Sequence, residues 1–162
     1  MSINPKESAK KLLESTWIGR GMPVDPVFIA TELGVDVLEA ELPEDIWGAL
    51  IKDEDKDPII VLSVNDSKNR KRFTCAHELG HYAYRLATDG NKYEYIDLRG
   101  NHSSTGNDPE EIFANQFAAS LLMPETEVKK LVYQQLPKFL MAQHFGVSDD
   151  AIRFRLKNLG LK

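Results

Sequence analysis

The chain has 162 residues, of which 42% are apolar and 28% charged, and its formal net charge is −5. These values are ordinary for one soluble globular domain, and the negative charge gives no general attraction to nucleic acid or acidic membranes. The single cysteine, Cys75, excludes a disulfide framework, and no run of 18 apolar residues is present, so we expect a cytoplasmic protein that does not span a membrane.

The N-terminal part is predicted to contain two short helices followed by three strands. Asn4 and Pro5 are typical of a helix start, as are Asp25 and Pro26. The helices are expected at 5–16 and 25–34, and the strands at 35–40, 46–53 and 58–64. Because the connections between the strands are short, we expect a small antiparallel three-stranded sheet.

The remainder is predicted to be mainly helical. A helix is expected at 70–86, and a polar stretch at 88–108 is interpreted as a long loop, which in a compact domain is often functional. Asp108 and Pro109 then begin a strong helix that Pro124 prevents from continuing. The residues after it are expected to be helical, with a break near Gly146.

The stretch "RFTCAHELGHYAYR", residues 72–85, carries a candidate metal site. Residues four apart lie on one face of a helix, so His77 and His81 can direct imidazole nitrogens at one zinc ion. Glu78 lies between them, placed to take a proton from a water that the metal activates. The alternative is an amphipathic helix that carries two structural histidines, and a third ligand has to decide.

Catalytic zinc has three protein ligands and one open position. The extended motif that adds a third histidine is excluded, because Tyr84 and Ala87 occupy its glycine and histidine positions. A glutamate on the downstream helix is the other solution.

Two adjacent glutamates on that helix are candidates for the third ligand. Glu110 shares its face with an apolar stripe that we expect in the core. Glu111 shares its face with Asn115 and a small residue, as a metal-facing stripe should. The residues favour Glu111 and leave Glu110 as the alternative; Asn115 is expected to orient a ligand histidine through its second ring nitrogen.

"RFTCAHELGH", followed some 30 residues later by "EIFANQFAASLLMP", resembles the ImmA/IrrE family of metallo-endopeptidases. The family has a zincin-like HExxH helix and a glutamate-bearing helix. The resemblance covers residues 5–130 and implies Zn²⁺ as cofactor. It implies His77, His81 and Glu111 as ligands and Glu78 as general base. Many members carry a second glutamate at the position of Phe113, a departure from which we expect little consequence.

Other candidates at the site have weaker support. Thr74 lies one turn before His77 and is expected to support the site, although a threonine that only packs is the commoner case. His102, in the polar loop, is a candidate for stabilising a developing oxyanion, and a solvated loop histidine is the alternative. Cys75 is interpreted as a small buried hydrophobe rather than a ligand.

The C-terminal segment has the spacing of a helix-turn-helix. Ala142, Gly146 and Ile152 fit its pattern, and Ser148 is expected to cap the second helix. Residues 137–162 contain five basic and two acidic residues. The two acids lie in the first turn of the second helix, where base contacts are normally made, so we expect packing on the body or a partner rather than DNA binding.

Together these features predict an α+β fold with a metallopeptidase-like domain at 1–130 and a helical segment at 131–162 packed on it. The leading hypothesis is a zinc-dependent endopeptidase. The resemblance implies a protein substrate, a helix-turn-helix repressor or antitoxin, of a phage or other mobile element. The alternatives are a toxin or regulatory module that acts by complex formation without proteolysis, and a transcription factor that uses residues 137–162.

Overall fold

A computed structural model describes residues 3–53, 55–88, 95–100 and 108–161. For residues 95–100 it describes the backbone only. The elements are α1 (Pro5–Thr16), α2 (Pro26–Glu32), β1 (Asp36–Ala40), β2 (Ile46–Lys52), β3 (Ile59–Ser63), α3 (Lys68–Thr88), β4 (Tyr95–Gly100), α4 (Pro109–Leu122), α5 (Glu125–Tyr133), α6 (Lys138–Phe145) and α7 (Asp149–Asn158). The fold is α+β, as predicted. In the part of the chain that the structure describes, every helix is too short or too polar to cross a membrane.

Four of the helices begin where the sequence predicts, whereas α3 extends two residues beyond its predicted bounds at each end. The side chains of Asn4, Asp25, Asp108 and Ser148 each accept a hydrogen bond from a backbone N–H in the first turn of the helix that follows. These bonds satisfy amides that would otherwise have no partner at a helix start. Gly146, with φ of +67°, ends α6 in the left-handed conformation that favours glycine.

The sheet differs from the expected one in two respects. It has four strands, in the order β1-β3-β2-β4, and β1 pairs with β3 in parallel, so the sheet is mixed rather than antiparallel. The prediction assumed that β1 pairs with the next strand in the chain, whereas β3 lies between β1 and β2. The fourth strand falls inside the segment predicted as a loop, where it pairs with β2.

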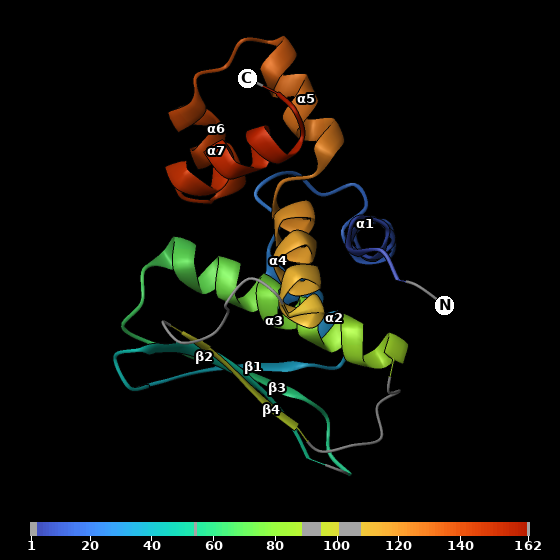
Figure 1. Cartoon of the computed structure of the whole chain (residues 1–162), viewed down its shortest axis with the longest axis vertical. Coiled ribbons are helices and arrows are strands. Elements are labelled where there is room, and N and C mark those ends of the chain that lie inside the picture. The colour runs from blue at the N-terminus through green and yellow to red at the C-terminus, as the bar shows by residue number, and fades with distance from the viewer. Residues whose placement is uncertain (1–2, 54, 89–94, 101–107, 162) are drawn as a thin grey trace.

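Helix α3 lies at the centre of the molecule (Figure 1). The sheet lies on one side of it and α4 crosses the other, while α5, α6 and α7 gather beyond the C-terminal end of α4. A continuous apolar core joins these parts, with members as far apart in sequence as Ala9, Leu79 and Leu156. Residues 74–82 of α3 are all buried, so the "HELGH" motif is held between the sheet and α4.

Two arginines fix the C-terminal segment to the rest. Arg72 of α3 donates hydrogen bonds to the carbonyls of Phe145 (3.1 Å) and Gly146 (3.0 Å) at the end of α6. Arg155 of α7 donates to the carbonyl of Met123 at the end of α4 (3.0 Å). Carbonyl groups at two helix ends, which have no partner within their own helices, thereby receive hydrogen bonds from arginine side chains. The division of the chain near residue 130 remains a prediction, but the segment after it packs on the body.

Candidate metal centre

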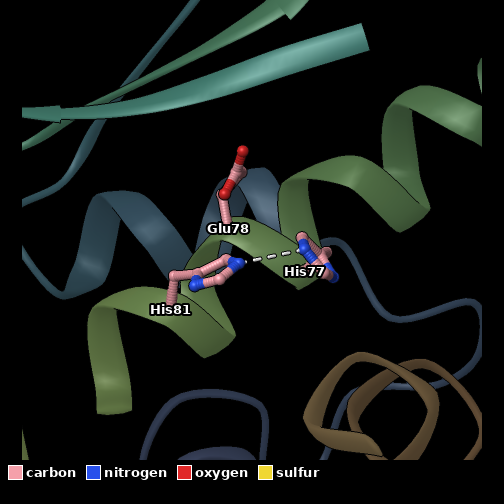
Figure 2. A group of neighbouring side chains, drawn as sticks. All are labelled: His77, Glu78 and His81. Atoms are coloured by element: carbon pink, nitrogen blue, oxygen red, sulfur yellow. Dashed lines mark hydrogen bonds between the residues drawn. The ribbon is translucent and has the colours of Figure 1, made fainter. Parts of the chain in front are cut away.

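The two histidines of the motif face the same side of α3. Both are buried, with His77 0% and His81 4% exposed, and their Nε2 atoms lie 3.1 Å apart. Figure 2 shows the rings converging, with the nitrogen of one directed at the nitrogen of the other. A spacing of four residues on a helix produces this approach, as the sequence predicted.

Glu111 brings a carboxylate to both histidines from the first turn of α4. Its Oε1 lies 3.0 Å from Nε2 of His81, and its Oε2 lies 3.2 Å from Nε2 of His77. An acidic residue is favoured in the first turn of a helix, where the backbone amides and the helix dipole are positive. The structure therefore brings together His77, His81 and Glu111, the three residues favoured as ligands.

The spacing of these donors fits a tetrahedral metal ion. Zinc binds nitrogen and oxygen ligands at about 2.0–2.2 Å, so two ligand atoms at tetrahedral corners lie roughly 3.3 Å apart. The three contacts between the imidazoles and the carboxylate measure 3.0, 3.1 and 3.2 Å. Two neutral imidazoles and one carboxylate are also the donor set of one class of catalytic zinc site. A metal ion of this kind fits the residues present.

A glycine allows α4 to come this close. A Cβ atom on Gly80 would lie 2.8 Å from Cα and 3.0 Å from the carbonyl oxygen of Ala114. Contacts that short to backbone atoms do not occur without displacement, so the close crossing of α3 and α4 requires glycine at this position. Gly80, the fourth residue of "HELGH", thus sets the distance from which Glu111 reaches the histidines.

Glu78 is fully buried, and its side chain leaves the helix in a different direction from the histidines. Figure 2 shows its carboxylate directed toward the strands of the sheet. Ligand atoms of His77, Glu78 and His81 all lie within 4.8 Å of one another. Glu78 is therefore the other possible third ligand. The short contacts of Glu111 with both Nε2 atoms favour Glu111, which leaves Glu78 beside the site.

Hydrogen bonds from His77 and His81 lower the pKa of Glu111, although partial burial opposes this shift. A carboxylate that stays ionised is the form that binds a metal. Burial raises the pKa of the Cys75 thiol, and Cys75 is 0% exposed. This environment agrees with the interpretation of Cys75 as a small core residue.

Glu110 is not part of the core, which corrects the sequence interpretation. Its Oε2 lies 2.6 Å from Nδ1 of His81 and 3.3 Å from Nε of Arg85, and its side chain is 19% exposed. The apolar stripe that begins at Ala114 is buried, but Glu110 lies one turn before it, at the edge of the core, where it contacts α3. Sequence reasoning missed this contact, although Arg85, four residues after His81, was a signal for it.

The residues expected to support the site are placed differently. No hydrogen bond joins Asn115 to either histidine within the described residues; its side chain lines a hollow of about 740 Å³. Thr74 is buried under the sheet, where a Cβ on Gly48 would lie 2.5 Å from its methyl group. His102 lies outside the described residues. Catalytic and supporting roles for these three residues stay predictions.

Residues 30–157 match the family model described as "IrrE N-terminal-like domain" (Peptidase_M78). The chain belongs to this family. The family is of metallopeptidase type, and the match includes the two histidines, both glutamates of α4 and the C-terminal helices. The resemblance seen in the sequence is therefore confirmed. The sequence matches no curated protein significantly.

Among solved structures, the chain is similar to a Mycobacterium tuberculosis transcriptional regulator. The TM-score is 0.64 with 17% sequence identity, and the alignment covers 94% of this chain but 46% of the regulator. The chain thus spans about half the length of that protein. At this identity the likeness establishes a shared fold.

Proposed function

We propose that this protein is a zinc-dependent endopeptidase that cleaves a partner protein. The proposal rests on one observation: two buried imidazoles and a carboxylate from a second helix converge with the spacing of a tetrahedral site. Membership of a metallopeptidase-type family supports it. His77, His81 and Glu111 would hold the ion, which when bound supplies Lewis acidity to a water molecule and a peptide carbonyl.

Glu78 is the general base of the proposed reaction. A ligand atom of its carboxylate lies within 4.8 Å of the ligand atoms of both histidines. In this position it accepts the proton of the attacking water and passes it to the leaving amine. A purely structural metal site gains nothing from a carboxylate held beside the ligands, so the placement of Glu78 favours catalysis.

The substrate we propose is a helix-turn-helix repressor or antitoxin, as the family resemblance implies. Cleavage of one bond in it would relieve repression. We do not propose DNA as a partner, because Asp149 and Asp150 form the first turn of α7 and would meet phosphate or base edges there.

The test is a Glu78→Gln variant assayed with candidate repressor proteins. We expect the variant to bind zinc as the wild type does and to lose cleavage by about 100-fold or more, because removal of a general base typically costs 10²–10⁴. Zinc content is measured by elemental analysis and cleavage by mass spectrometry of the partner. Persistent cleavage by a zinc-loaded Glu78→Gln protein would contradict the mechanism.

A second candidate function is partner binding without proteolysis, as a toxin or regulatory module. It is favoured by three exposed aromatic residues of the C-terminal segment: Tyr133 (90% exposed), Phe139 (57%) and Phe154 (65%). Exposed aromatic side chains are enriched at protein interfaces. A stable complex with an uncleaved partner, equally tight in wild type and Glu78→Gln, would support this function over the first.

A further inference from the structure

We propose that Glu110 is a positioning residue: it orients His81 for metal binding and is itself held by Arg85. This inference rests on the proposed zinc site and adds two residues to it. The sequence leaves Glu110 as the alternative third ligand, but this residue contacts Nδ1 of His81 rather than the Nε2 atom that approaches His77. The contacts that carry it are the 2.6 Å approach of Glu110 Oε2 to Nδ1 of His81 and the 3.3 Å approach of the same oxygen to Nε of Arg85.

The two ring nitrogens of His81 contact different glutamates. A carboxylate oxygen only accepts hydrogen bonds, so the short contact with Glu110 places the proton of the neutral imidazole on Nδ1. In the metal-bound form Nε2 would then direct its lone pair at the ion, and this is the nitrogen that lies 3.1 Å from His77 and 3.0 Å from Glu111. Glu110 thus selects the tautomer in which the metal-facing nitrogen can act as a ligand.

Arg85 orients the carboxylate of Glu110. Arg85 follows His81 by four residues on α3, so His77, His81 and Arg85 lie along one face of that helix. The guanidinium of Arg85 contacts the oxygen that His81 also contacts, which restricts the Glu110 rotamer to the one that reaches His81. Its side chain is 22% exposed, so the contact is only partly open to solvent.

The two adjacent glutamates therefore have different tasks. Glu111 faces the metal-binding nitrogens, whereas Glu110 faces the other edge of the His81 ring. Both lie in the first turn of α4, and each contacts a different nitrogen of the His81 ring. Removing Glu110 should leave all three ligands in the chain but allow the ring to rotate.

The experiment compares Glu110→Ala, Glu110→Gln and Arg85→Met with wild type. Gln116→Ala is the control, because Gln116 is an exposed residue of the same helix. Zinc affinity is measured by competition with a chelator. Thermal unfolding of each metal-free protein separates affinity from stability. The coordination sphere is followed by the visible spectrum of the cobalt(II) form.

We expect zinc affinity to fall about 10- to 100-fold in Glu110→Ala, the usual effect of removing such a partner. Glu110→Gln should recover most of it, because the amide oxygen still accepts from Nδ1. Arg85→Met should lie between them, and the cobalt spectrum of Glu110→Ala should change. Gln116→Ala should match wild type.

Two results would overturn the inference in different ways. If wild type binds zinc and Glu110→Ala binds it equally tightly, the positioning role is wrong while the proposed function stands. The same holds if affinity falls only in proportion to the stability of the metal-free protein, with no rescue by glutamine. If wild type binds no zinc after metal replenishment, the proposed function fails and takes the positioning role with it.

Discussion

At the scale of single residues, Glu110 and Glu111 show how two identical side chains acquire different surroundings. Adjacent positions on a helix point about 100° apart, so one carboxylate reaches the metal-facing nitrogens and the other reaches the opposite ring edge. The sequence predicted the first contact, because Glu111 lies on a face with small and polar neighbours. It did not predict the second, because the apolar stripe below Glu110 made that face look buried, and a stripe does not show where a helix passes the edge of the core.

The residue-scale prediction concerns Glu111→Ala. We expect this variant to lose zinc affinity by at least about 100-fold, more than a residue that acts only through a ligand, because one of three ligands is removed. Zinc content after dialysis against a weak chelator measures the effect. Gln116→Ala serves again as control, and retention of one zinc per chain by Glu111→Ala would indicate that Glu78 or Glu110 is the third ligand.

At the scale of elements, α3 and α4 assemble the candidate centre because they cross closely. The helix boundaries followed from caps and prolines that are visible in the sequence, such as Asp108 before Pro109. The strand pairing did not follow, because the order β1-β3-β2-β4 depends on contacts between segments that are distant in the chain. Strand β4 was hidden for a related reason: its surroundings are rich in turn-forming residues, so its short alternating stretch was interpreted as loop.

The crossing itself gives a prediction for Gly80→Ala. Replacing a helical glycine by alanine normally stabilises a helix by up to about 1 kcal/mol. Here the added Cβ meets the backbone of Ala114 at 2.8 Å, so we expect a net loss of about 1–3 kcal/mol, as for an overpacked core, with weaker zinc binding. Chemical denaturation and zinc titration measure the two effects.

The control is Gly21→Ala, because a Cβ on Gly21 would have no neighbour within 4 Å. This variant should change the free energy of unfolding by less than about 0.5 kcal/mol. If Gly80→Ala is as stable as wild type or more stable, the prediction is wrong, and α4 can move away from α3 without a loss of folding free energy.

A surface network between α1 and α5 gives a prediction on pH. Glu125 contacts Lys129 at 2.6 Å and Lys6 at 2.5 Å, and these two lysines lower the pKa of Glu125 to about 2. The pKa of Glu125 is lower in the folded than in the unfolded state. Its contacts with the two lysines therefore stabilise the fold at pH values above the ordinary pKa of 4.5, and this effect is lost as the pH falls toward 2.

Glu125→Gln should therefore be less stable than wild type at pH 7, by no more than about 1 kcal/mol, and the two should converge near pH 2. Urea unfolding at several pH values and salt concentrations measures the difference. A difference that persists unchanged at acid pH would exclude the ionic origin.

At the scale of the whole molecule, the C-terminal helices share the core of the part that carries the candidate metal centre. Ile152 and Leu156 are buried, and Arg155 inserts a charged side chain that is 8% exposed to reach the carbonyl of Met123. Burial lowers the pKa of Arg155, and Glu125 partly offsets this effect. The sequence indicated the helical pair, but only the structure shows which carbonyls its arginines reach.

Arg155→Met keeps most of the apolar stem and removes the hydrogen bond. We expect a loss of about 1–3 kcal/mol, because the carbonyl of Met123 then stays buried with one partner fewer. Thermal or urea unfolding measures it, with Arg153→Met, an exposed residue of the same helix, as control. A single cooperative transition should persist in both variants, since one core unites the two parts. Separate transitions would instead support two independent units.

Because α3 and α4 cross closely, an ion in the proposed site would also cross-link the two helices. His81 and Glu111 are 30 residues apart, so an ion that holds both closes a loop of that length. A permanent cross-link around such a loop would stabilise the fold by about 3.6 kcal/mol in the chain-entropy model. A chain that holds an ion in the proposed site would therefore unfold less often and resist degradation longer than the same chain without it.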